Sequence, residues 1–265
     1  YITYKEELLA KTLVDEDGNF MININVDDTT YIFTNLGKYS AYMYIVPGKS
    51  YQIVLPPYQE KSEANKLNPY FEPIYIHLGI LNAEENDLNV LIHMFNDTYS
   101  SYFSKYVIEV MNKTNIDPQQ IIKDIEKIEF PFVSYNDNFF KNYRIYKYAL
   151  LEHLSFKDKS VAIAEKYFRN KKILYNNPSY MDLFNQIFTN FFEFYGRTKE
   201  GAKIYNDINI NKNYYDLVNT LLKSNLFMKN YDLMEFVILK CLYEEFYKDK
   251  FSRSGILNIL DTIIN

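Results

Sequence analysis

Residues 51–58 read YQIVLPPY, and this stretch divides the chain into two parts with different hydrophobic periodicity. Before the proline pair, Tyr51, Ile53 and Leu55 recur at every second position, which is the period of a β-strand. From about residue 83 onward the hydrophobic residues recur at steps of three and four, the period of an α-helix. The change of period predicts an α+β fold with two domains.

The part before the prolines predicts five short antiparallel strands joined by tight turns. Turn signals occur at 15–18 (DEDG), 36–38 (LGK) and 47–49 (PGK). The expected strands cover residues 8–14, 20–26, 31–35, 42–46 and 51–55. Strands of this number and length are typical of a small β-sandwich. Because the first of them begins almost at Tyr1, we expect that upstream strands could be missing from the sandwich.

We expect three regions along the chain: an antiparallel β-sandwich domain over 1–58, a linker over 59–82 and an all-α helical domain over 83–265. The linker contains residues 68–73 (NPYFEP), where two prolines favour extended backbone. An Asp117-Pro118 pair marks the start of one helix, which should stop before Pro131. Further helices are expected at 137–153, 158–170, 178–195, 198–207, 213–223, 230–248 and 253–263. Because the helices show no sequence repeat, they indicate a bundle.

Composition excludes some classes of partner and leaves others open. The 265 residues carry a formal net charge of -5, which provides no electrostatic footprint for nucleic acid. No apolar run has the length of a transmembrane segment. The 27 Tyr and 20 Phe are compatible with a peptide- or carbohydrate-binding surface, but helix packing explains them more simply. The chain begins with Tyr1, so we expect a processed or truncated piece whose targeting information lies elsewhere.

The residues that commonly carry chemistry are few and scattered. The single cysteine, Cys241, lies on an apolar helical stripe and is expected to be buried and inert. His77, His93 and His153 are isolated in sequence, and none has a second metal ligand one helical turn away. We therefore predict no catalytic residue, no cofactor-binding residue and no metal site. A deep pocket holding His93 or His153 beside a carboxylate would instead favour an enzyme.

Two further patterns fall short of known motifs. Residues 196–203 (GRTKEGAK) approach a phosphate-binding P-loop, but Ala202 separates the glycine from the lysine and a helix precedes the stretch. The acidic groups at 15–17, 84–85 and 244–245 are explained as solvated turn and helix-start carboxylates.

Four segments resemble a known family in their order and spacing: 14–20 (VDEDGNF), 46–51 (VPGKSY), 67–73 (LNPYFEP) and 239–247 (LKCLYEEFY) with its continuation to Asp261. The pattern is similar to the long N-terminal, non-catalytic region of TlpA-type thioredoxin-like thiol-disulfide proteins of Bacteroidota-type bacteria. In that family a signal or lipoprotein peptide, a β-sandwich and a helical region precede a thioredoxin fold with a CxxC motif. This chain contains no CxxC, so no redox residue can be transferred to it.

The resemblance implies an accessory or interaction region of an envelope protein, periplasmic or lipoprotein-anchored, with the redox domain lying beyond Asn265. Its implied partners are that thioredoxin-like domain and a protein client. The expected interaction surface comprises five aromatic residues, namely Tyr70, Phe71, Tyr99, Tyr102 and Phe103. The alternative is a stand-alone periplasmic module that binds a peptide or a glycan through such aromatic residues.

Overall fold

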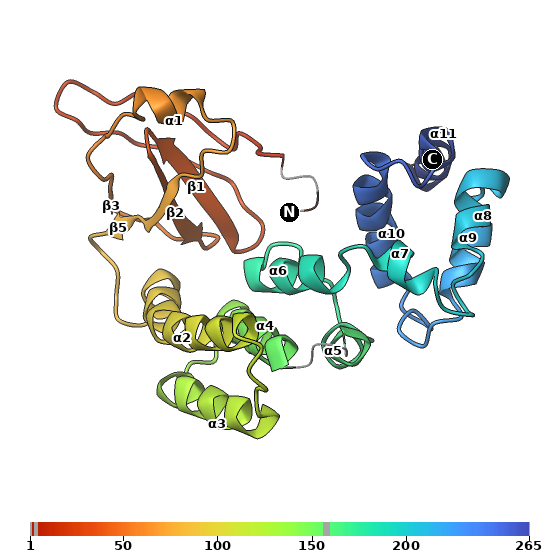
Figure 1. The fold of residues 1–265 in the computed structure, drawn as a ribbon. Helices are drawn as coiled ribbons and strands as arrows, with labels where there is room; N and C mark the ends of the chain where they lie inside the picture. Colours follow the sequence, from red (N-terminus) through yellow and green to blue (C-terminus); the bar gives the residue numbers. More distant parts are fainter. Residues whose placement is uncertain (1, 3–4, 156–159, 265) are drawn as a thin grey trace. The chain divides into compact units, whose positions relative to one another are not determined.

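The computed structural model describes residues 2, 5–155 and 160–264, and it has an α+β fold (Figure 1). These residues form two compact units. The sheet unit comprises residues 6–145 and 176–178, and the helical unit comprises the described residues of 1–5, 146–175 and 179–265. The boundary at residues 145 and 146 falls inside helix α4 (Asn138–Ser155).

The sheet unit contains two small sheets. The larger has the strand order β1-β2-β4, in which β1 (Thr30–Leu36) pairs antiparallel with β2 (Tyr39–Ile45). β4 (Ile74–His77) then pairs with β2 in parallel. The smaller sheet joins β3 (Ile53–Val54) to β5 (Gly79–Ile80) antiparallel. The strands are therefore mixed in direction, which corrects the expectation of an all-antiparallel arrangement.

β2 is covered on both of its faces, and the alternation of its side chains explains how. Ala41, Met43 and Ile45 enter one hydrophobic cluster, against which Ile53 of β3 and Ile80 of β5 also pack. On the opposite face the ring of Tyr44 contacts the α4 residues Phe139 and Tyr143, with ring centroids 5.6 and 6.2 Å apart. The central strand therefore joins a layer of short strands to a layer of helix.

The strands expected at 8–14 and 20–26 are wrong, because neither segment forms a ladder. The alternation in the second segment still has a structural basis: Ile24 and Val26 are half-buried against the hydrophobic cluster of β2, while Asn23 and Asn25 are exposed. A turn at Asp15–Asn19 joins the two segments, and the Asp15 side chain accepts hydrogen bonds from the N–H groups of Asp17 and Asn19. Extended backbone with an inward face needs a partner strand before it becomes a β-strand.

The stretch 59–82, expected as a linker, contains the short helix α1 (Glu63–Leu67) together with β4 and β5. Periodicity did not indicate β4, because a four-residue strand at a sheet edge carries too few positions to show a pattern. The compact units therefore do not coincide with the expected ranges 1–58 and 83–265: helices α2 and α3 belong with the sheets.

Besides the short α1, the sheet unit contains the helices α2 (Leu88–Met111), α3 (Pro118–Glu129) and the first part of α4. Asp117 caps α3 by accepting a hydrogen bond from the N–H of Gln119, and α3 ends at Glu129, before Pro131 as predicted. A 3₁₀ turn at Phe130–Phe132 follows it. The ring of Phe95 in α2 contacts Phe132, Phe140 and Tyr143. Most of the aromatic residues in these contacts serve packing.

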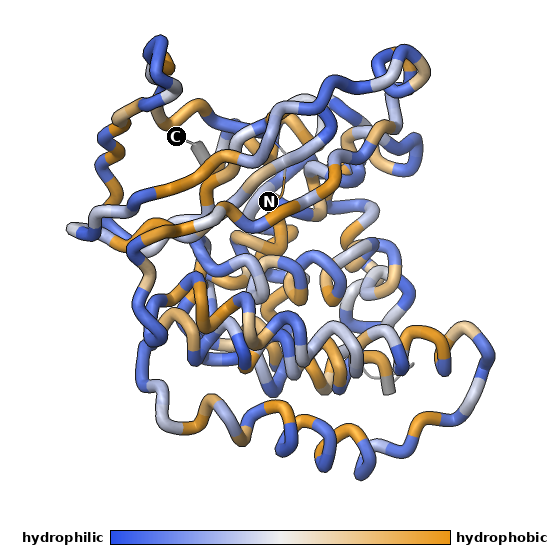
Figure 2. Tube along the Cα trace, turned by 90° about the vertical axis from the view of Figure 1, so that its left-hand side faces the viewer, coloured by the Kyte–Doolittle hydropathy of each residue, from blue (hydrophilic) through white to orange (hydrophobic). Residues whose placement is uncertain are grey.

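The helical unit consists of the second part of α4 and a series of mostly short helices. They are α5 (Ser160–Tyr167), α6 (Pro178–Ile187), α7 (Phe191–Tyr195), α8 (Ile204–Asn206), a π-helical turn (Asp207–Asn211), α9 (Tyr214–Leu221), α10 (Tyr231–Phe246) and α11 (Arg253–Ile264). Hydrophilic and hydrophobic positions alternate along the helices of both units (Figure 2). The helix expected over 158–170 begins at Ser160 in the structure, since residues 158 and 159 lie outside the described ones.

The helix expected over 178–195 is interrupted. Asn190 adopts a left-handed conformation with φ of 55°, which ends the first helix and starts α7. The helix expected over 198–207 is reduced to turns and the three residues of α8. In both places the chain changes direction to bury Phe192 and Ile204, which are each 1% exposed.

Candidate functional site

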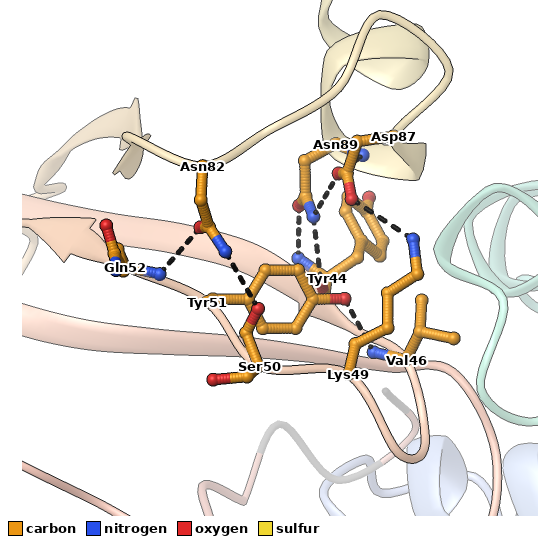
Figure 3. A network of polar contacts seen from close by, with 9 residues as sticks. All are labelled: Tyr44, Val46, Lys49, Ser50, Tyr51, Gln52, Asn82, Asp87 and Asn89. Atoms are coloured by element: carbon orange, nitrogen blue, oxygen red, sulfur yellow. Dashed lines mark hydrogen bonds and ion pairs between the residues drawn. The ribbon is translucent and has the colours of Figure 1, made fainter.

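The N-terminus of α2 is fastened to β2 through a buried asparagine (Figure 3). The Asn89 Oδ1 accepts a hydrogen bond from the Tyr44 N–H at 2.7 Å, and its Nδ2 donates to the Tyr44 carbonyl at 2.9 Å. Asp87 caps the helix by accepting from the Asn89 N–H, and the Lys49 amino group lies 3.3 Å from its carboxylate. These contacts hold the sheet and α2 in one fixed relation within the sheet unit.

The loop between β2 and β3 is tied down by a second set of main-chain contacts in the same network (Figure 3). The Asn82 side chain accepts from the Gln52 N–H and donates to the Ser50 carbonyl. The Tyr51 hydroxyl accepts from the Val46 N–H at 3.1 Å, and burial raises the pKa of this phenol. This loop contains the PGK turn of the sequence, so the turn is positioned from both sides.

β4 has a free edge. Its Ile74 N–H donates to the Lys38 carbonyl, and the Leu78 N–H that follows it donates to the Tyr42 carbonyl. In a parallel ladder the alternate residues, Tyr75 and His77, direct their main-chain groups away from β2. Among the described residues, β4 is the last strand of its sheet on this side. Tyr75 is 63% exposed and Ile74 is 52% exposed, so apolar side chains flank the free edge on both faces.

Two of the expected surface residues lie directly before this edge. Tyr70 is 88% exposed and Phe71 is half-buried, with the Lys61 amino group 4.5 Å from its ring centroid. Asn68 organises the segment, because its side chain accepts from the Tyr70 N–H and its carbonyl accepts from the Phe71 N–H. The NPYFEP stretch is therefore an ordered lead into β4.

The other three expected residues lie on α2, away in sequence from the edge of β4. Tyr99 is only 6% exposed and stacks between Phe95 and Phe103, with ring centroids 5.6 and 5.7 Å away. Tyr102 and Phe103 are half-buried. Tyr99 therefore serves the helix core. The expected surface divides into one part before β4 and one part along α2.

The structure brings together two histidines that the sequence leaves apart. The rings of His77 and His93 have centroids 5.8 Å apart, and Tyr42 contacts His77 at 5.4 Å. His93 Nε2 lies 3.6 Å from the Asp97 carboxylate. Burial lowers the pKa of His77, whose Nδ1 is 2.9 Å from the Leu78 carbonyl. No sequence signal indicated this pair, because one histidine is on a strand and the other on a helix.

This cluster lacks the enclosure that an acid–base site requires. The side chains of His93 and Asp97 are 59% and 69% exposed, so water competes for both groups. His153 is half-buried, and burial lowers its pKa. Its Nδ1 has no hydrogen-bond partner among the described residues. Neither His93 nor His153 lines the polar cleft of about 430 Å³ found in the helical unit.

The remaining sequence candidates take structural positions. Cys241 is 1% exposed within the core of the helical unit, and burial raises the pKa of its thiol. The residues that the structure describes contain no group of three His, Cys, Asp or Glu side chains arranged to hold a metal ion. None of the helices in this described part of the chain has the length and apolarity to cross a membrane.

Comparison with known proteins gives no relative. No protein-family model, no curated protein and no solved structure matches this chain. Function is therefore inferred from the residues and their arrangement.

Proposed function

We propose that this chain is a non-catalytic region that binds another polypeptide along the free edge of β4, as the accessory part of an envelope thioredoxin-like protein. The observation that carries the binding role is the unpaired edge itself. Extended polypeptides add to such edges through main-chain hydrogen bonds, with alternate side chains giving specificity. Exposed edges without a cover are otherwise a liability for aggregation.

The neighbourhood of β4 supports this edge over that of β1. Leu67 and Tyr70, which precede β4, are 82% and 88% exposed, and Ile74 and Tyr75 flank the edge itself. Phe33, the most exposed large hydrophobic residue of β1, is 39% exposed. Apolar side chains next to a free ladder provide the contact area that main-chain hydrogen bonds alone do not. The Asn89 network fixes the edge in advance, which lowers the entropy lost on binding.

The accessory role rests on the four segments that resemble TlpA-type proteins. That resemblance also motivates the envelope location and the proposal that the two small sheets form an incomplete β-sandwich. A further strand at β4 would then extend the larger sheet. The client or the thioredoxin-like domain itself could supply it.

Binding at the edge is tested with Tyr75→Pro. Proline removes the outward N–H while the inward donors of Ile74 and Leu78 remain. We expect the unmodified chain to bind members of an array of immobilised peptides rich in β-branched and aromatic residues, and Tyr75→Pro to lose that binding. Tyr58→Pro is the matched control, because Tyr58 is also exposed (66%) but lies outside β4. Equal binding by both variants would refute the edge as the site.

The accessory role is tested separately by sequencing the coding region on both sides of this chain. A CxxC-containing thioredoxin-like domain in the same polypeptide is expected. A polypeptide without one would favour the alternative, a stand-alone module that binds a peptide or a glycan through exposed aromatic residues such as Tyr70. Reduction of insulin disulfides by this chain alone would contradict the non-catalytic assignment.

A further inference from the structure

A polar cleft of about 430 Å³ lies where α8, the π-helical turn and α9 meet. Its volume falls in the range of small-molecule sites in proteins. Among the described residues that line it, Ile210 is the one apolar side chain. A cleft with so little apolar lining suits a ligand that hydrogen-bonds over most of its surface.

The π-helical turn at Asp207–Asn211 is held in place by contacts on both sides. Lys212 ends it in a left-handed conformation with φ of 51°, and its N–H donates to the Asp207 carbonyl. On the α11 side, the Ser252 N–H donates to the Asn209 side chain at 2.5 Å. Gly255 of α11 packs so closely that a Cβ there would lie 2.0 Å from the Ile208 carbonyl oxygen. Single π-turns within helices occur frequently at functional sites.

The polar groups around this turn are arranged in advance. Asp207 is 3% exposed and accepts a hydrogen bond from the Thr220 hydroxyl at 2.6 Å. The Asn211 side chain donates to the Asp216 carboxylate at 2.9 Å. Burial raises the pKa of Asp207, while the nearby Lys203 and Lys223 amino groups partly offset that effect. Burying a carboxyl group is costly, and a further hydrogen-bond donor on the cleft side would stabilise it.

The lining also selects the charge of the ligand. Two lysines, Lys203 and Lys223, balance the two aspartates, Asp207 and Asp216, so the charged groups of the lining cancel. A strong anion would meet the carboxylates and a cation would meet the amino groups. The exposed side chains of Asn206, Asn211 and Asn219 present amide donors and acceptors together, which suits a neutral ligand with several hydroxyl groups.

We propose that this cleft binds a small neutral polyhydroxylated ligand of one or two sugar rings. The proposal is independent of the edge of β4, because it concerns residues of the helical unit alone. The exposed asparagine amides and the half-buried Asp216 carboxylate can pair with vicinal hydroxyl groups, and Ile210 can cover a patch of C–H bonds. The open, polar lining predicts weak binding with dissociation constants of about 1 mM, corresponding to only about 4 kcal/mol.

Saturation-transfer difference NMR on the full chain tests the proposal, with glucose, galactose, mannose and N-acetylglucosamine as probes. Inorganic phosphate and benzamidine are the anionic and cationic comparisons and are followed by chemical-shift titration. At least one sugar should show transfer, and its affinity should fall by about tenfold or more in Asn219→Ala, equivalent to losing one or two hydrogen bonds. Asn219 is exposed in the cleft lining, so this variant should remain folded.

Two further variants complete the experiment. Lys223→Gln changes a second lining residue and should also weaken sugar binding. Asn258→Ala removes an asparagine on α11 that is also exposed but lies outside the cleft lining, and it should leave binding unchanged. Absence of transfer to all four sugars, equal affinity in Asn219→Ala, or saturable binding of phosphate or benzamidine alone would overturn the proposal.

Discussion

Asn89 bonds to both main-chain groups of Tyr44, with its Oδ1 accepting from the N–H at 2.7 Å and its Nδ2 donating to the carbonyl at 2.9 Å. Asn89 is 0% exposed and Tyr44 is 3% exposed, so water does not replace these bonds. The Asn89 side chain thereby links the end of β2 to the first turn of α2. Asn82 makes the same pair of contacts to Gln52 and Ser50 from an exposed position (Figure 3).

The two asparagines provide a matched test of burial. Asn89→Ala leaves the Tyr44 N–H and carbonyl buried without partners, so we expect a loss of about 2–4 kcal/mol in the free energy of unfolding. Asn82→Ala lets water reach the freed groups, and a loss below about 1 kcal/mol is expected. Urea denaturation followed by circular dichroism measures both. Equal losses of stability in the two variants would show that burial does not decide how much these asparagine hydrogen bonds contribute.

Asp124 of α3 provides a prediction of pH dependence. Burial by itself raises the pKa of this carboxyl group, but hydrogen bonds from Tyr106, Lys127, Gln120 and Lys105 outweigh burial and lower the pKa below its usual 3.8. A lowered folded-state pKa stabilises the protein above the ordinary pKa and loses that effect as pH falls through the lowered value. We expect Asp124→Asn to lose about 2 kcal/mol at neutral pH. The difference from the unmodified chain should shrink below pH 3.8 in the same denaturation assay.

Asp207 predicts a pH dependence of stability with the opposite sign. Its folded-state pKa is raised by burial, so ionisation opposes folding as pH rises above the ordinary value of 3.8. Asp207→Asn keeps an acceptor for the Thr220 hydroxyl and removes the charge. We expect this variant to equal or exceed the unmodified chain in stability at neutral pH and to lose that advantage in acid. A variant destabilised at neutral pH but not in acid would show that the charged form is the favoured one.

Alanine substitutions at two glycines with positive φ distinguish the cost of a steric clash from the cost of the backbone conformation. Gly37 has φ of 63°, and a Cβ there would lie 1.9 Å from the Gln59 carbonyl oxygen, whereas Gly48 has φ of 74° with open space around it. Gly48→Ala should cost about 1 kcal/mol from the backbone conformation alone. Gly37→Ala should cost about 3 kcal/mol or more, because main chain must move. Thermal unfolding of the two variants gives the comparison.

The thiol of Cys241 reports on the core of the helical unit. The side chain is 1% exposed, and burial raises its pKa, so the reactive thiolate is scarce in the folded state. A chromogenic disulfide reagent should label it slowly under native conditions and rapidly in urea. Fast native labelling would mean that α10 opens readily.

The sequence predicted the parts of the fold that depend on local signals. Asp117-Pro118 started α3 as expected, and the strands expected at 31–35 and 42–46 correspond to β1 (Thr30–Leu36) and β2 (Tyr39–Ile45). Local signals failed where a distant partner decides the outcome. Ile24 and Val26 face inward without a ladder, and β4 exists because β2 offers it an edge.

In the candidate sites too, local sequence signals predicted some features, and distant contacts decided the others. Tyr70 is exposed, as expected of a surface residue, but the importance of its position comes from the edge of β4, which periodicity did not show. Tyr99 looked equivalent in sequence and lies in the helix core. The cleft around Asp207 depends on a π-turn and on close packing of Gly255, and neither has a sequence signature.

The parallel pairing of β4 with β2 has a consequence for the order in which the chain folds. β1 and β2 are joined by a tight turn, and the consecutive helices α10 and α11 contact each other, so both pairs can form early. β4 joins β2 only after the segment 46–73 has closed into a loop, which is slower. Pulsed hydrogen exchange should find the amides of α10 protected before those of β4. During that interval β2 is exposed along one side, and in this state we expect newly made chains to aggregate most readily.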